Sequence, residues 1–133
     1  MTLYVVTGPP CVGKSTWVRE RAQPGDIVID LDRIALAITA EATEHHNYPP
    51  HIRKAAILLR MKAVDLAINY SRSGVSYIIH AKPNGPAKNR YRKAQAVMVT
   101  LDAPYSVLMA RAKAERPPHI WGTLAKWYEE PED

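Results

Sequence analysis

The chain has 133 residues, of which 47% are hydrophobic and 23% charged. This is the composition of a globular protein, and the length suits one domain, which we expect to span residues 1–133. No apolar run reaches the roughly 20 residues that cross a bilayer, and the N-terminus leads into a predicted strand instead of a signal peptide, so we expect no membrane partner. The single cysteine, Cys11, excludes an internal disulfide and fits a reducing compartment, so we expect a cytoplasmic protein.

The net charge of +5 is unevenly distributed. No acidic residue occurs between Asp65 and Asp102, whereas the basic residues there are Arg72, Lys82, Lys88, Arg90, Arg92 and Lys93. Such a one-sign stretch can attract a polyanion, and it can equally be a solvated helix face. Both interpretations stay open, and nucleic acid is therefore one partner to consider.

A phosphate-binding loop is the most specific motif in the chain. Residues 2–7 form an apolar, β-rich run that predicts a strand, and residues 15–22 are compatible with a helix. Between them, residues 8–16 read Gly-Pro-Pro-Cys-Val-Gly-Lys-Ser-Thr. This matches the pattern G-x-x-x-x-G-K-[ST] in the strand-to-helix context that the motif requires.

The chemistry of this loop predicts binding of ATP or another nucleoside triphosphate. The glycines let the backbone wrap around an anion, while amides near the start of the helix point at phosphate oxygens. Lys14 is expected to reach the β- and γ-phosphates, and the Ser15 hydroxyl to hold Mg²⁺. The residues expected at the nucleotide are Gly8, Cys11, Val12, Gly13, Lys14, Ser15 and Thr16.

The rest of the chain alternates predicted strands and helices. Strands are expected at residues 26–30, 75–81 and 96–101, and helices at 32–39, 52–71, 105–115 and 120–130, with a short basic helix after the turn at 83–86 and a loop at 40–51. The long helix should face a core through Ile52, Ala56, Leu59, Ala63, Leu66 and Tyr70. The alternation predicts an α/β fold with about four parallel strands.

Acidic residues follow the second predicted strand. Ligands of such sheets bind beyond the carboxyl ends of the strands, which draws attention to Asp30, Asp32 and Arg33. In phosphoryl transfer to a hydroxyl, a carboxylate accepts the proton or orients the nucleophile, and Asp32 is placed for that role. Asp30 is a candidate for holding Mg²⁺ through water. Asp32 can also serve as the N-cap of the next helix, alone or in addition to catalysis.

Two arginines follow the last predicted strand. Arg111 lies within an apolar helical pattern, and Arg116 comes near the end of the same helix. Late cations of this kind can form a lid that covers the nucleotide and neutralises the transferring phosphoryl group. Ordinary surface basicity is the alternative, and it is harder to set aside for Arg116.

Taken in order, these motifs resemble the polynucleotide-kinase-like branch of small P-loop kinases and compact phage-type P-loop NTPases. The resemblance covers nearly the whole chain, although only its first motif is highly specific. It rests on residues 8–17, 27–33, 74–84 and 101–104, the Arg111 and Arg116 pair, and residues 120–128.

The resemblance implies a three-layer P-loop NTPase fold with a helical lid. It also implies that Lys14 and Ser15 bind phosphates and Mg²⁺, that Asp32 is the general base, and that Arg111 or Arg116 contacts the nucleotide phosphates. By this resemblance the chain is identified as a P-loop kinase.

Two positions depart from the family pattern. His80 stands after the third strand where the family usually has an aspartate, and Ala35 stands where the polynucleotide kinases have an arginine that grips the acceptor's phosphate. His80 is then expected to contact a phosphate, to bond to Asp32 or to be an interior histidine. The residues expected on the substrate side are Arg33, His80, Lys82 and Arg90.

Three functions are consistent with the sequence. The first is an ATP-dependent phosphotransferase that moves the γ-phosphate to a hydroxyl, with a polynucleotide 5′-OH favoured by the basic residues between Lys82 and Lys93. The second is a kinase for a nucleoside or another small molecule. The third is a nucleotide-dependent binding or accessory NTPase with weak hydrolysis, which His80 in the usual acidic position favours.

Overall fold

The computed structural model describes residues 1–40, 48–116 and 118–129 of the chain. Its centre is a parallel sheet of four strands in the order β2-β3-β1-β4. The strands are β1 (Thr2–Thr7), β2 (Ile27–Ile29), β3 (Val75–Ile79) and β4 (Val97–Thr100). The predicted α/β class with a small parallel sheet is therefore confirmed, and the strand ends lie within two residues of the expected positions.

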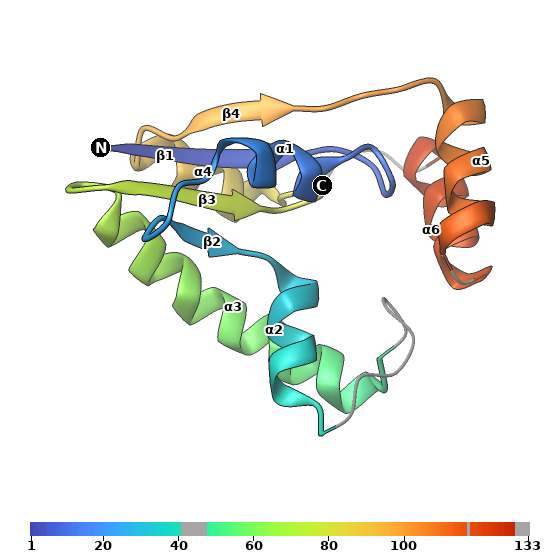
Figure 1. Ribbon diagram of the computed structural model, residues 1–133, viewed down its shortest axis with the longest axis horizontal. Coiled ribbons are helices and arrows are strands. Elements are labelled where there is room, and N and C mark those ends of the chain that lie inside the picture. The colour runs from blue at the N-terminus through green and yellow to red at the C-terminus, as the bar shows by residue number, and fades with distance from the viewer. Residues whose placement is uncertain (41–47, 117, 130–133) are drawn as a thin grey trace.

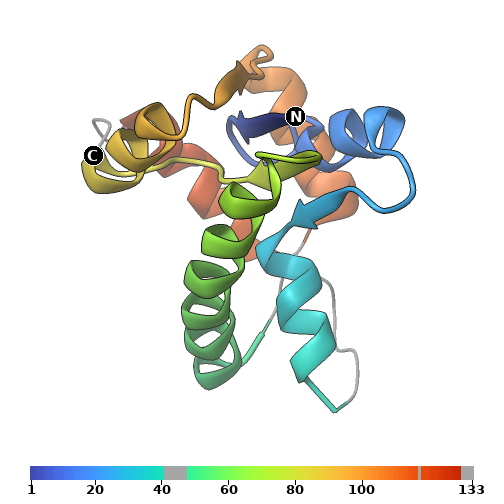
Figure 2. The ribbon, with the colours of Figure 1, turned by 90° about the vertical axis from the view of Figure 1, so that its left-hand side faces the viewer.

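Helices cover both faces of this sheet (Figures 1 and 2). They are α1 (Lys14–Arg21), α2 (Leu31–Ile38), α3 (Pro50–Tyr70), α4 (Gly85–Lys93), α5 (Tyr105–Glu115) and α6 (Pro118–Glu129). Each expected helix is present, with α3 beginning two residues earlier than predicted. Most of the loop expected at residues 40–51 lies outside the described residues, as does the last residue of the predicted helix 120–130.

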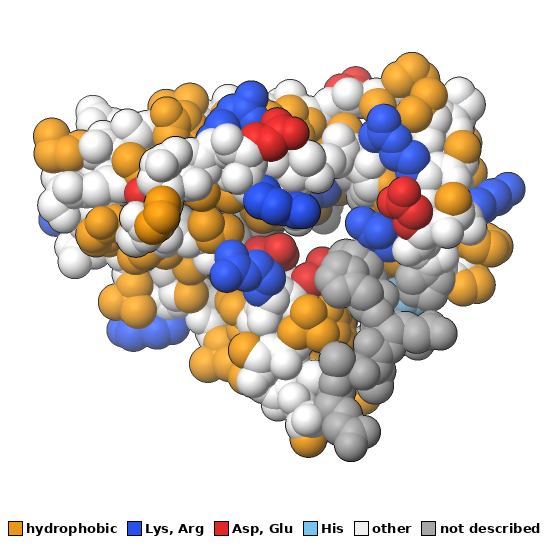
Figure 3. Space-filling view, viewed as in Figure 1, with side chains coloured by type: hydrophobic (Ala, Val, Ile, Leu, Met, Phe, Trp, Pro, Cys, Tyr) orange, Lys and Arg blue, Asp and Glu red, His pale blue; other side chains and the backbone are white. Residues whose placement is uncertain are grey.

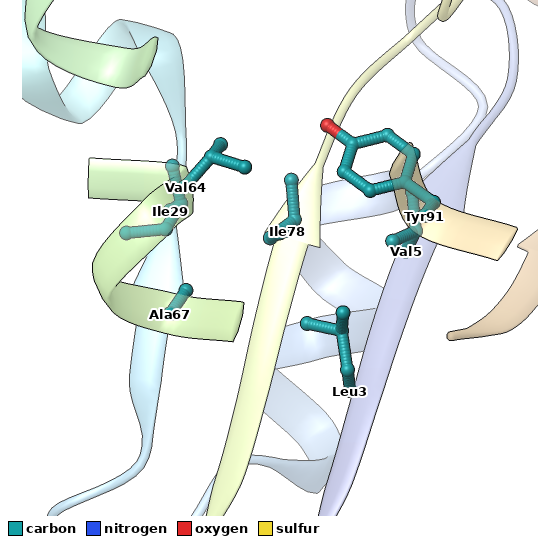
Figure 4. Packing of buried hydrophobic residues seen from close by; sticks show 7 residues of the cluster. All are labelled: Leu3, Val5, Ile29, Val64, Ala67, Ile78 and Tyr91. Carbon is teal, nitrogen blue, oxygen red and sulfur yellow. The ribbon is translucent and has the colours of Figure 1, made fainter. Parts of the chain in front are cut away.

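The core alternates across the sheet because successive strand residues point to opposite faces. On one face, Val6 and Tyr77 pack with Val18 of α1. On the other, the buried cluster consists of Leu3, Val5, Ile29, Val64, Ala67, Ile78 and Tyr91, drawn from three strands, α3 and α4 (Figure 4). The three-layer arrangement follows from these two apolar contacts.

The predicted apolar stripe of α3 is confirmed only in part. Ala56 is buried and Ala63 packs against the core, as expected. Leu59 and Leu66, however, are 47% and 58% exposed, and the buried residues in their half of the helix are Val64 and Ala67. The helix is apolar on more than one side, so several stripes satisfy the helical spacing equally well. Its small alanines let it pack closely beneath the sheet and along α2, and this close packing selects the buried face.

The helices leave the carboxyl ends of the strands open between two walls. Figure 1 shows α2 and the first half of α3 running away from the sheet on one side, and α5 with α6 standing beyond the end of β4 on the other. Figure 3 shows acidic and basic side chains gathered around a hollow in the same region. None of the helices in the described part of the chain is long and apolar enough to cross a membrane.

Candidate functional site

The loop between β1 and α1 is held by its neighbours at the carboxyl edge of the sheet. The amide of Gly8 donates to the carbonyl of Ala81 at 3.1 Å, extending the β1–β3 pairing into the loop. A Cβ built on Gly8 would lie 2.6 Å from the carbonyl oxygen of Leu101, and Gly8 has φ +145°. Gly13, with φ +100°, precedes the first turn of α1. The two glycines of the motif are thus needed where the backbone turns and where strands β1 and β4 converge.

Replacing Gly8 by alanine should therefore destabilise the protein more than the same change at Gly25. Both residues have positive φ, which costs on the order of 1–3 kcal/mol for a residue with a Cβ. Only at Gly8 does the new Cβ meet backbone, since nothing lies within 4 Å of a Cβ at Gly25. Chemical denaturation of the two variants compares these costs directly. Equal losses of stability would mean that the contact between the new Cβ and the carbonyl oxygen of Leu101 adds no cost.

Lys14 folds its side chain back over the loop. Its ammonium donates to the carbonyl oxygens of Gly8 and Pro9, at 2.8 Å each. Burial lowers the pKa of Lys14 to about 8, and the nearby carboxylates of Asp30 and Asp32 oppose that shift. The structure therefore brings the loop lysine and both acidic residues of the predicted site within electrostatic reach of one another.

Asp30, and not Asp32, is the N-cap of α2. The buried Asp30 has extended backbone angles, and its Oδ1 accepts from the amide of Asp32 at 3.2 Å. The alternative in which Asp32 caps this helix is wrong, because the helix begins one residue earlier than expected. Tyr48 donates its hydroxyl to the carbonyl of Asp32 at 3.2 Å, which ties the start of α2 to the segment before α3. The side chain of Asp32 is thus not needed as the helix cap.

The two late arginines reach the loop from α5. Arg111 donates from Nη1 to the carbonyl of Cys11 at 3.2 Å, and Arg116, at the end of the helix, is close enough to lower the pKa of Lys14. Trp121 of α6 donates its indole N–H to two carbonyls at the end of α5, at 2.8 and 3.1 Å, one of them that of Arg116. The sequence did not predict this positioning role of Trp121, which depends on how α6 turns back onto α5.

Cys11 adopts φ +67°, a left-handed conformation that is uncommon for a residue with a side chain. Burial raises the pKa of its thiol, although the arginines of α5 and Lys14 oppose this shift. The carbonyl of Cys11 is thereby presented to Arg111. Val12 packs against the α5–α6 cluster together with Cys11. These two loop residues couple the phosphate-binding loop to the helices that carry the late arginines.

On the other side of Gly8 lies a cavity of about 410 Å³. Lys82, Lys88, Trp127 and Tyr128 contribute to its lining, and the ammonium of Lys82 lies 5.3 Å from the ring centroid of Trp127. This is the separation of a cation–π contact. The structure therefore brings Lys82 next to the loop, where α6 closes over it.

His80 is turned toward α4. Its Nδ1 is 2.7 Å from the hydroxyl of Tyr91, and the two rings are perpendicular. Burial lowers the pKa of His80 to about 4, and the positive charge of Arg60 adds to this shift. Of the three alternatives for His80, the bond to Tyr91 fits an interior histidine, and the imidazole is neutral at physiological pH.

Arg90 does not join the loop residues. Arg90 forms an ion pair with Asp65 of α3 and lies in a separate surface hollow with Arg72 and Lys93. Residues on a helix are 100° apart, so Lys88 can line the cavity at the loop while Arg90 points elsewhere. Arg33 is exposed on the first turn of α2. The expectation that Arg90 binds substrate receives no geometric support, whereas that for Arg33, which follows Asp32 directly, stays a prediction.

Ser15 and Asp30 carry the oxygens that could hold a metal ion. Ser15 is exposed in the first turn of α1, next to Thr16, and the Asp30 carboxylate follows β2. Hard oxygen ligands of this kind, few in number, suit Mg²⁺, which usually completes its shell with phosphate oxygens and water. Among the described residues, no group of three or more His, Cys, Asp or Glu side chains is arranged to hold a metal by itself.

This combination of a parallel sheet, a glycine loop and a loop lysine defines a P-loop nucleotide-binding domain. A family model described as "AAA domain" matches residues 3–118, and the chain belongs to this family. The match extends from β1 to the start of α6 and confirms the P-loop NTPase fold. A search of curated proteins found no match.

Proposed function

We propose that the protein is an ATP-dependent phosphotransferase that moves the γ-phosphate to a hydroxyl group. The observation that carries the proposal is the meeting of residues from three distant segments at one loop. Lys14 lies within electrostatic reach of Asp30, Asp32 and Arg116, while Arg111 donates to the loop carbonyl of Cys11. A loop cation, a carboxylate and late arginines are the groups that phosphoryl transfer requires.

In this proposal the chain's own residues divide the work. The loop amides and Lys14 hold the triphosphate, and Asp32 accepts the proton of the attacking hydroxyl. Arg111 and Arg116 neutralise charge that develops on the transferring group. Ser15 and Asp30 would hold Mg²⁺, which when bound supplies further neutralisation of the phosphate oxygens.

For the acceptor we propose a polynucleotide 5′-hydroxyl. The support comes from Lys82 and Lys88, which line the cavity beside Gly8. Cations at this position could contact the phosphates of a strand whose end enters the site. The rest of the basic stretch contributes less, because Arg90 lies in a separate surface hollow, where it is paired with Asp65.

That pairing favours a second candidate, a nucleoside or other small-molecule acceptor. With Arg90 directed to Asp65, the basic residues do not form one continuous path from the loop along α4. A short acceptor needs no such path. The two candidates share the same transfer chemistry and differ only in the acceptor.

Incubation with γ-labelled ATP tests the proposal. The label is followed into a 5′-hydroxyl oligonucleotide, into a panel of nucleosides and other hydroxyl compounds, and into inorganic phosphate. Transfer to the oligonucleotide supports the first candidate, and transfer only to a small molecule supports the second. Label that appears only in inorganic phosphate contradicts phosphoryl transfer to a hydroxyl and favours an accessory NTPase.

A further inference from the structure

One arginine of α3 occupies the helix face that packs against the sheet. Val64 and Ala67 of this face are buried in the core beneath the strands (Figure 4). Arg60 is one helical turn before Val64, and Arg53 is two turns further toward the helix start, so both continue the same face. Because α3 extends past the sheet, this continuation leads from the core toward the carboxyl edge that carries the loop (Figure 1).

The surroundings of Arg60 are polar groups at the end of β3. Burial lowers the pKa of His80 and the charge of Arg60 adds to this shift, whereas burial raises the pKa of Tyr91 and Arg60 opposes it. Burial also lowers the pKa of Arg60, and the charge of Arg53 adds to that shift. The hydroxyl of Tyr91 points toward the end of β3 (Figure 4), and it lies 2.7 Å from Nδ1 of His80. The four side chains therefore form one cluster, which we call the α3 cationic cluster: Arg53, Arg60, His80 and Tyr91.

This cluster holds positive charge that the described residues do not neutralise. Arg60 is half-buried, and no hydrogen bond or ion pair joins it to a carboxylate in the described part of the chain. The single acidic residue of α3, Asp65, is paired with Arg90. His80 is neutral and Tyr91 is uncharged, so neither offsets the guanidinium. A half-buried cation is costly without a counter-charge, and an anion is the group that would offset it.

β3, which leads into His80, lies in the sheet between β1, which leads into the loop, and β2, which leads into the helix with Asp32. His80 precedes Ala81, whose carbonyl accepts from the amide of Gly8. On the other side, α3 packs along α2, which has Asp32 in its first turn. An anion bound by Arg60 would thus be on the acceptor side of the loop.

We propose that the α3 cationic cluster binds a phosphate group of the acceptor. The planar guanidinium of Arg60 presents paired N–H donors that match phosphate oxygens, and Arg53 adds a second positive charge. The neutral imidazole and the phenol supply further hydrogen-bonding groups without adding charge. The inference rests on the proposed phosphoryl transfer for its role, since the bound phosphate would position a hydroxyl near Asp32.

Binding of inorganic phosphate to the full chain tests this site without any turnover. The loop is first saturated with a non-hydrolysable ATP analogue and Mg²⁺, and phosphate is then titrated by calorimetry. We expect saturable binding at one site, weakened about tenfold or more in Arg60→Gln and less in Arg60→Lys, which keeps charge but loses the planar fork. Lys62→Gln removes the same charge from an exposed position on the same helix and should change the affinity less than about twofold.

Two further arms identify the source of the phosphate. Thymidine 3′-monophosphate and the dinucleotide TpT present a phosphomonoester and a phosphodiester, and thymidine presents neither. The source is the kind of phosphate ester that binds more tightly than thymidine to the wild type and loses this advantage in Arg60→Gln. If transfer to a hydroxyl is observed and Arg60→Gln binds phosphate like the wild type, this inference fails while the proposed function stands. If no transfer occurs but phosphate binds through Arg60, the phosphate site stands and the proposed function fails.

Thermal unfolding separates binding from folding. Removing a half-buried cation without a carboxylate partner should leave the melting temperature of Arg60→Gln unchanged or raised. Should that variant unfold, the exposed Arg53→Gln provides the second test, with an expected loss of phosphate affinity of several fold. Wild-type protein that shows no saturable phosphate binding, or an Arg53→Gln variant with unchanged affinity, would overturn the proposal.

Discussion

Replacing Asp32 by alanine should reduce phosphoryl transfer by about 10²–10⁴-fold, the contribution of a positioned general base. Affinity for ATP should change only a few fold, because Lys14 and the loop amides remain. The helix should also survive, since Asp30 caps α2 through the amide of Asp32, and this amide is unaffected by the substitution. The turnover number, ATP affinity and unfolding free energy of the purified variant are the three measurements needed.

Asp26→Asn is the matched control for this prediction. Asp26 is also next to β2, but at its amino end, where its carboxylate accepts from the amide of Gln23 at 2.8 Å. Transfer by the control should stay within about twofold of the wild type. An Asp32→Ala variant that transfers phosphate at the wild-type rate would exclude Asp32 as the base.

The sheet and the loop could be predicted because their signals are local. The strand before Gly8, the spacing to Lys14 and the helix after it occupy one short stretch of sequence, and the pattern demands a backbone that only glycine adopts easily. The positive φ of Gly8 and Gly13 is the structural counterpart of that pattern. The placement of Asp32 after a strand end followed from the general geometry of parallel sheets.

The environment of the remaining cations could not be predicted in this way. Arg90 is near Lys82 in sequence, yet in the fold it pairs with Asp65, which is 25 positions earlier on another helix. Arg60 gave no signal at all, because an arginine in an amphipathic helix usually faces solvent. Only the packing of α3 against the sheet reveals that Arg60 lies on the buried face. Pairwise charge contacts between elements are tertiary features, and no local pattern encodes them.

Affinity for ATP should fall as the pH rises above 8, because Lys14 loses its proton in the nucleotide-free protein. Burial lowers the pKa of Lys14 from its ordinary value of 10.5 to about 8. A bound triphosphate favours the charged lysine and raises this pKa again, so binding above pH 8 must take up a proton. The dissociation constant should be constant near pH 7 and increase about tenfold per pH unit above 8, approaching a few hundredfold near pH 10.5. Titration calorimetry in buffers of different ionisation enthalpy measures the proton uptake.

Titration of Lys14 should have the opposite effect on the stability of the nucleotide-free protein, which should rise with pH. The folded-state pKa of Lys14 is below the unfolded value, so between pH 8 and 10.5 the unfolded chain binds more protons. The contribution of Lys14 to the unfolding free energy should therefore rise with pH across this range, by roughly 3 kcal/mol at most. In Lys14→Met both the rise in stability and the pH-dependent loss of ATP affinity should disappear together. Persistence of either in the variant would assign the titration to another group.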